Sequence, residues 1–135
     1  MSSVLEIIKT RRSVRKYKAD PVSRALIEKV IEAGTYAATG RGQQSPVIIA
    51  VTNKDLREKI TKLNAEIFGR PDFDTFYGAP VILIVAANKA NNTATYDGSL
   101  VLGNMMLEAH ELGLGSCWIH RCKEAMDSEL YKDLF

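Results

Sequence analysis

The sequence predicts an α+β fold with α/β-like layering, in which helices cover both faces of one sheet. Two observations support this prediction. Helical and strand patterns follow one another in the order αα, β, α, β, α, β, α, and the strand patterns are continuous apolar runs, which are typical of strands buried on both faces. The chain has 135 residues, of which 46% are hydrophobic and 25% are charged. This composition excludes a disordered or fibrous chain, and the length predicts a single domain over residues 1–135.

Two helices are predicted at the start of the chain. Ser2 or Ser3 caps the first helix, and Glu6, three residues after Ser3, completes a capping box. A turn at residues 20–21 separates it from the second helix, which begins after Ser23. The second helix carries one apolar stripe, formed by Leu26, Ile27, Val30, Ile31, Gly34 and Ala38.

The middle of the chain alternates between apolar strands and helices. Residues 39–46 read TGRGQQSP and predict a loop. The β-branched run at residues 47–52 predicts a buried strand, and residues 54–68 return to the helical period. A second buried strand is predicted at residues 80–87.

The last third of the chain contains the most apolar helix, at residues 96–112. Between residues 99 and 109 its only charged residue is Glu108, so the helix requires a central position or a partner subunit. Residues 114–119 predict a third short strand, and residues 124–134 a final helix. Three strands make a thin sheet, and the chain ends on the apolar pair Leu134 and Phe135. We therefore expect a C-terminal strand to be missing and to be supplied by further sequence or by another chain.

The net charge of +2 conceals one strongly basic segment. Residues 9–18 contain six basic residues and no acid, which leaves 12 basic and 16 acidic residues elsewhere. A nucleic-acid-binding protein is more often basic over a whole face, whereas a patch this confined suits a small anion such as phosphate. If the segment is extended, Arg11, Ser13 and Arg15 point to one side and form a phosphate clamp. A solvated basic face is an equally good interpretation of these residue types.

The remaining polar residues do not assemble an acid–base catalyst. The loop at residues 40–44 is neither a Walker loop nor a dinucleotide fingerprint, so a plain connecting loop is its simplest interpretation. A zinc site needs about four closely grouped ligands. Cys117, Cys122 and His120 are grouped in the sequence, and only His110 adds to them. We therefore expect no metal, and we expect a cofactor to supply the chemistry if the protein is an enzyme.

Several segments together resemble one family. They are the basic segment at residues 11–17, the loop from Ala37 to Gln44, the entry to the second strand at residues 76–80, the helix at residues 97–112 and the stretch at residues 113–119. In this order they resemble the nitroreductase-like family of FMN-dependent oxidoreductases. The resemblance implies a nitroreductase-like fold with a central mixed sheet flanked by helices, here without its C-terminal strand.

The resemblance also assigns roles to residues. Arg11, Arg12, Ser13 and Arg15 would hold the FMN phosphate and ribityl chain. The other expected flavin-binding residues are Gln44, Asn64, Trp118, Ile119 and His120. Arg41 is expected to meet an anionic part of a substrate, and no side chain is expected to be catalytic because the flavin carries the chemistry. The loop departs from the family pattern at Ala38, Thr39, Gly42, Ser45 and Pro46, which replace a proline, serine, asparagine, proline and tryptophan.

The function implied by the resemblance is that of an NAD(P)H oxidoreductase. Hydride would pass from NADH or NADPH through flavin N5 to a nitroaromatic, quinone or similar acceptor by a ping-pong mechanism, in a homodimer with flavin at the subunit interface. The longest apolar run, residues 79–87, is too short to span a bilayer, and two cysteines with no signal peptide predict a cytoplasmic protein with neither membrane nor nucleic-acid partner. The alternatives are a non-catalytic flavin- or phosphate-binding module, inactive through its short C-terminus, and a basic adaptor for nucleic acid.

Overall fold

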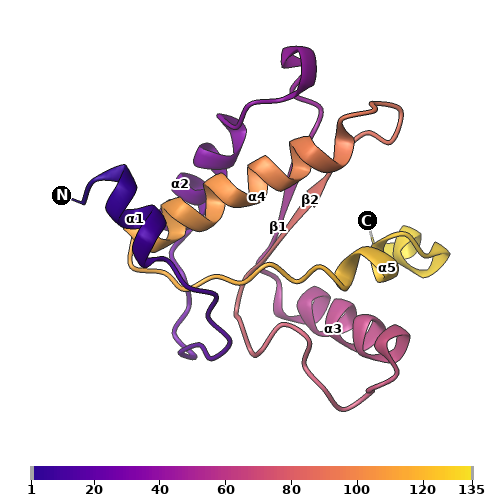
Figure 1. Ribbon diagram of the computed structural model, residues 1–135. Helices are drawn as coiled ribbons and strands as arrows, with labels where there is room; N and C mark the ends of the chain where they lie inside the picture. Colours follow the sequence, from indigo (N-terminus) through magenta and orange to yellow (C-terminus); the bar gives the residue numbers. More distant parts are fainter. Residues whose placement is uncertain (1, 135) are drawn as a thin grey trace.

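The computed structural model describes residues 2–134. Figure 1 shows helices arranged around a small central sheet. The elements in chain order are α1 (Val4–Thr10), α2 (Arg24–Thr35), the 3-10 turn η1 (Gly40–Gly42), β1 (Val47–Val51), α3 (Lys54–Phe68), β2 (Ile82–Ala86), α4 (Ala94–Glu111), α5 (Cys122–Met126) and the 3-10 helix η2 (Glu129–Leu134). No helix in this part of the chain is long and apolar enough to cross a membrane.

The sheet consists of β1 and β2, which pair antiparallel with Ile49 opposite Ile84. Because successive side chains of a strand point to opposite faces, the two apolar runs supply two cores. Ile49, Val51, Ile82 and Ile84 join the core on one face, whereas Ile48, Leu83 and Val85 pack into the core on the other.

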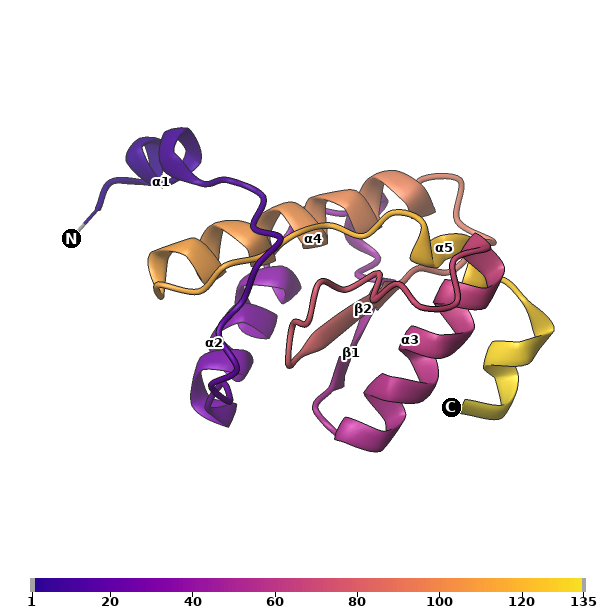
Figure 2. The same ribbon diagram turned by 90° about the horizontal axis from the view of Figure 1, so that it is seen from below.

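Helices cover each of these faces, as expected for strands that are apolar throughout (Figure 2). Ile60 of α3 and Ala125 of α5 lie in the first core, and Val30 of α2 and Met105 of α4 lie in the second. At Gly34 of α2 an added Cβ would lie 2.8 Å from Met105 Cγ, so glycine permits the close approach of α2 and α4. The α+β class and the two-sided covering of the sheet are confirmed.

The predicted third strand is wrong. Residues 114–119 are extended, but they make only an isolated parallel bridge, between Ser116 and Ser13. The described residues therefore form a two-stranded antiparallel sheet, and the parallel bridge between Ser13 and Ser116 lies outside it. Apolar alternation identifies an extended segment, but pairing depends on a partner strand distant in sequence, and here the partner is short and polar.

The predicted final helix is interrupted. It divides into α5 and η2, and the Ser128 hydroxyl donates a hydrogen bond of 2.7 Å to the Ala125 carbonyl at the break. A serine hydroxyl that bonds the preceding turn competes with the regular helical pattern, which is consistent with the end of α5 here.

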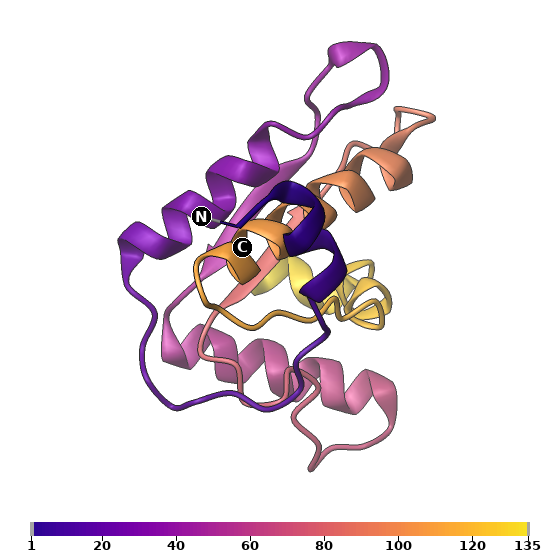
Figure 3. The same cartoon turned by 60° about the vertical axis from the view of Figure 1, so that its left-hand side comes forward.

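Helix α1 is loosely packed. Ser3 Oγ caps it by accepting the Glu6 N–H at 3.1 Å, as predicted, but none of its residues is buried. It lies against the C-terminal half of α4 (Figure 3). There Thr10 Oγ1 lies 2.9 Å from His110 Nε2. The Thr10 hydroxyl donates to the Glu6 carbonyl, so it accepts from the imidazole.

Candidate functional site

The bridge between Ser13 and Ser116 brings two predicted flavin-binding segments side by side. Val14 N donates to the Ser116 carbonyl at 2.9 Å, which places the basic segment along the stretch that leads to Trp118. A Cβ on Gly115 would lie 3.0 Å from Val14 Cγ1, so glycine at this position allows the close contact. These segments are about a hundred residues apart in the sequence, and their contact creates the candidate site.

The two neighbouring arginines of the basic segment are arranged differently. Arg11 is half-buried, and its Nη1 is fully buried with no hydrogen-bond partner among residues 2–134. Arg12 Nη1 instead donates to the carbonyls of Lys9 at 2.7 Å and Arg11 at 2.8 Å, which closes the C-terminus of α1. A buried guanidinium nitrogen without an acceptor is unusual, and an anion would satisfy it.

Ser13 and Arg15 are exposed on the same extended segment. Tyr17 anchors the far end of the segment through a hydrogen bond of 2.5 Å from its hydroxyl to the Val14 carbonyl. Burial raises the pKa of the Tyr17 phenol, and nearby Cys117 raises it further. The basic segment and the 114–120 stretch therefore remain neighbours beyond the bridge.

Trp118, Ile119 and His120 lie on this stretch between α4 and α5. Ile119 packs on the core formed with α3, whereas the Trp118 side chain is 45% exposed. The rings of Trp118 and His120 meet edge to face with centroids 6.2 Å apart. The apolar side of the stretch is thus fixed to the core, and two aromatic rings remain accessible beside the basic segment.

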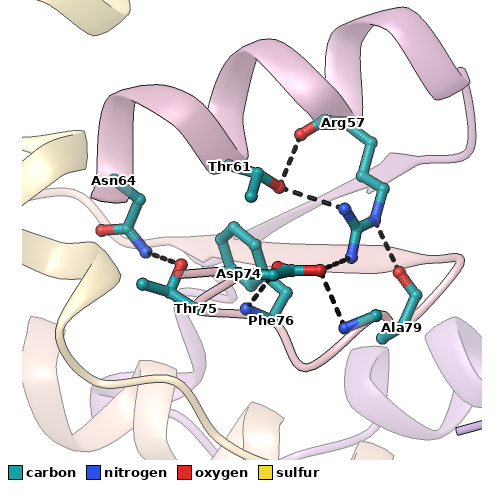
Figure 4. Close-up of polar contacts among 8 residues, drawn as sticks. Arg57, Thr61, Asn64, Asp74, Thr75, Phe76 and Ala79 are labelled. Atoms are coloured by element: carbon teal, nitrogen blue, oxygen red, sulfur yellow. Dashed lines mark hydrogen bonds and ion pairs between the residues drawn. The ribbon is translucent and has the colours of Figure 1, made fainter. Parts of the chain in front are cut away.

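Two other predicted flavin ligands are engaged elsewhere. Asn64, in α3, is 1% exposed, and its Nδ2 donates to Thr75 Oγ1 at 2.7 Å (Figure 4). Gln44 has a φ of 53° and is held to Thr39, whose hydroxyl oxygen accepts the Gln44 N–H at 3.0 Å. Neither side chain is hydrogen-bonded to the basic segment in the described residues.

The loop with Arg41 and Gln44 lies at the opposite end of α4 from Arg11. Gly40 N donates to Asp97 Oδ1 in the first turn of α4, whereas Thr10 meets His110 in its last turn. At 1.5 Å per residue, these two attachment points are about 20 Å apart. Within one chain, the structure therefore does not bring Arg41 and Gln44 to the basic segment.

Sequence reasoning did not identify Asp97. Its side chain is 3% exposed, with Oδ1 accepting from Gly40 N and Oδ2 from the Thr93 hydroxyl, both at 2.9 Å. The available signal was an acid in the first turn of an otherwise apolar helix, where a carboxylate is favoured by the helix dipole.

Arg57 and Asp74 form a second polar network that sequence reasoning did not identify (Figure 4). Arg57 donates to Asp74 Oδ2 at 2.9 Å and to the Ala79 carbonyl at 2.6 Å. Asp74 also accepts the N–H groups of Phe76 and Gly78. Burial acts to raise the pKa of Asp74, but the hydrogen bonds from Arg57 and the backbone outweigh it, so the pKa lies below its ordinary value. The network fixes the loop that leads into β2.

Comparison with known proteins identifies the family of this chain. The pattern that defines the Nitroreductase family matches residues 8–134. The crystal structure of a nitroreductase with bound FMN from Bacteroides fragilis superposes with a TM-score of 0.91 at 28% identity, covering 99% of this chain and 78% of that one.

Two curated relatives are also similar. A Methanothermobacter thermautotrophicus protein named "Putative NADH dehydrogenase/NAD(P)H nitroreductase" is 35% identical over 85% of this chain and 59% of its own length. A Cr(VI) reductase from a Pseudomonas species is 30% identical over 95% of this chain and 59% of its own length. The chain therefore spans about 59% of the length of these curated relatives. The match to the family pattern over residues 8–134 shows that this chain belongs to the Nitroreductase family.

Proposed function

We propose that this chain, as one domain over residues 1–135, binds FMN and acts as an NAD(P)H oxidoreductase of nitroreductase type. One observation carries the proposal: a buried Arg11 nitrogen without an acceptor lies beside the bridge that joins the basic segment to the Trp118 stretch. The names of the similar proteins, which include an FMN-bound nitroreductase, an NAD(P)H nitroreductase and a Cr(VI) reductase, support the same reaction class.

The residues present fit the proposed cofactor. The basic segment offers donors and no acid, which suits the dianionic phosphate of FMN. Arg11, Ser13 and Arg15 would bind the phosphate and ribityl chain, and Arg12 would contribute the N–H groups that the α1 carbonyls leave free. Trp118, Ile119 and His120 would lie against the flavin ring and limit the access of water. The bound FMN would supply the redox chemistry, taking hydride at N5 from NADH or NADPH and passing two electrons to a nitroaromatic, quinone or similar acceptor in ping-pong order.

A homodimer would complete the site. The Gln44 loop is about 20 Å from the basic segment of its own chain along α4, so a second copy is the source that could bring such a loop to the phosphate clamp. Apolar side chains suited to an interface are exposed on α1 and α4, namely Val4, Leu5, Ile8, Tyr96 and Leu100. We propose a cytoplasmic homodimer with flavin at the subunit interface, Asn64 supporting that pocket from α3, and a small-molecule acceptor rather than a nucleic-acid or membrane partner.

The proposal is tested by flavin titration followed by reduction. Trp118 is the only tryptophan, so FMN bound beside it should quench the intrinsic fluorescence of the protein. Anaerobic NADH or NADPH should then bleach the flavin absorbance, and a nitroaromatic or quinone should restore it. Quenching without bleaching would indicate the non-catalytic binding module instead, and a protein that takes up no FMN would refute both.

A further inference from the structure

A polar cleft lies at the N-terminal end of α4. It has a volume of about 300 Å³ and runs between the turn at residues 40–43 and the loop at residues 90–93. Its described lining is made of backbone, amide and hydroxyl groups, and Arg41 is the one charged side chain among them. No carboxylate forms an ion pair with Arg41 within residues 2–134. The cleft therefore presents a cation that forms no ion pair among the described residues and that lies among neutral groups.

Arg41 is held in an unusual backbone conformation. Its φ and ψ are 58° and 18°, a left-handed conformation that is uncommon for a residue with a side chain. Such a conformation persists only where neighbouring contacts impose it. Next to it, a Cβ at Gly40 would lie 2.8 Å from Thr93 Cγ2, so the turn is pressed directly against the start of α4.

Asp97 ties the residue before Arg41 to the start of α4. Its buried carboxylate accepts the Gly40 N–H, immediately before Arg41, and the Thr93 hydroxyl, which lines the opposite wall of the cleft. One carboxylate thus joins both walls. Within residues 2–134 neither oxygen forms an ion pair with Arg41, so Asp97 orients the turn without a salt bridge to the guanidinium.

We infer that the cleft binds an anionic group of a substrate, with Arg41 as its cationic ligand and Asp97 as a positioning residue for Arg41. This inference rests on the proposed function. A guanidinium without an ion-pair partner suits a carboxylate or a phosphate. The group can belong to the electron acceptor or to the additional phosphate that distinguishes NADPH from NADH.

The test compares charged and neutral substrates of one reaction. In FMN-loaded enzyme, R41A should raise the KM for para-nitrobenzoate about tenfold, the loss of one charge-assisted contact, and leave para-nitrobenzyl alcohol nearly unchanged. A parallel comparison of NADPH with NADH identifies the dinucleotide phosphate as the source if only the KM for NADPH rises. Either pattern supports the inference. It would be overturned if R41A changed the KM equally for the two nitro compounds and equally for NADPH and NADH.

The positioning role of Asp97 has its own variants. D97A should reduce the charge preference, which is the preference of the enzyme for para-nitrobenzoate over para-nitrobenzyl alcohol. D97A combined with R41A should reduce this preference no further than R41A alone, because both changes act through the Arg41 side chain. D97N retains an oxygen for the Gly40 N–H and should preserve most of the preference. T93V removes the second bond without opening the core, and it serves if D97A does not fold.

A readout without turnover completes the test. Hydrogen exchange at the Gly40 amide should become faster in D97A than in wild type, whereas E111A, at the exposed far end of α4, should leave it unchanged. The role of Asp97 would be overturned if the Gly40 amide exchanged equally fast in D97A and in wild type. It would also be overturned if the D97A/R41A double variant had a lower charge preference than R41A alone. Wild-type enzyme that reduces neither a nitro compound nor a quinone would overturn the proposed function and this inference with it. Normal turnover without any preference for charged substrates would overturn the inference alone.

Discussion

Replacing Asp74 with alanine should destabilise the protein far more than its position in a loop suggests. The substitution removes the acceptor for Arg57 and for the backbone N–H groups of Phe76 and Gly78. The Arg57 side chain is only 14% exposed, so its charge would be left largely buried and unpaired. The loop between α3 and β2 would lose the contacts that hold it beneath α3.

The expected loss of stability in D74A depends on how many of the hydrogen bonds to Asp74 water cannot replace. A hydrogen bond to a charged group contributes about 1.5–3 kcal/mol, and removal of one partner of a fully buried pair costs about 3–5 kcal/mol. Asp74 is 35% exposed and Gly78 is also accessible, so water recovers part of the loss. We expect D74A to lower the free energy of unfolding by about 3 kcal/mol, a large part of the 5–15 kcal/mol typical of a domain.

Urea unfolding followed by far-ultraviolet circular dichroism measures this cost. With a slope of about 2 kcal/mol/M, the midpoint should fall by about 1.5 M. D72A is the matched control, because Asp72 lies on the same loop, is exposed and makes no ion pair among the described residues, so its effect should stay within about 0.5 kcal/mol. Adding R57M to D74A should recover part of the loss by removing the unpaired charge. Equal midpoints for D74A and D72A would refute the reasoning.

Three further predictions follow from other contacts. Because the pKa of Asp74 is lowered on folding, its stabilisation is present above the ordinary carboxyl pKa of about 4 and is lost as the pH falls through the lower folded value; acid titration should therefore destabilise wild type more steeply than D74N. R11A should weaken FMN binding about tenfold to a hundredfold but barely change riboflavin binding, measured by fluorescence quenching, and an equal loss for both ligands would count against a phosphate contact. G34A places a Cβ 2.8 Å from Met105 Cγ and should cost about 1–3 kcal/mol in thermal unfolding, whereas G103A, with nothing within 4 Å, should cost nothing; similar effects of the two would contradict the packing argument.

Much of the fold could be predicted from the sequence because it is encoded locally. The caps at Ser3 and Ser23 are three residues from the N–H groups they accept, at Glu6 and Leu26, and both are confirmed. The apolar runs that became β1 and β2 are likewise recognisable within a few residues. The third strand was mispredicted because extended conformation is a local property, whereas pairing is not.

In the candidate site, too, the features that could be predicted are those encoded locally in the sequence. The basic segment at residues 9–18 is contiguous in the sequence, so residue types alone suggest an anion site there, with a solvated basic face as an equal alternative. Asp97 acts on Gly40, 57 residues away, and Asp74 acts on Arg57, 17 residues away. The spacing of residues in the sequence does not identify such partners. From the sequence alone, Asp97 looks like an ordinary acid at a helix start and Asp74 like an ordinary acid in a turn.

The attachments at the two ends of α4 impose a constraint on its length. Asp97 holds the Arg41 turn near the start of the helix, and His110 holds α1 at its end, each by side chains on fixed sides of one rigid rod. Inserting a single residue between them would rotate one attachment by about 100° relative to the other and move it about 1.5 Å. Loops elsewhere can grow or shrink without such a penalty. Natural variation in chain length should therefore avoid the interval between Asp97 and His110, even where individual side chains within it change freely.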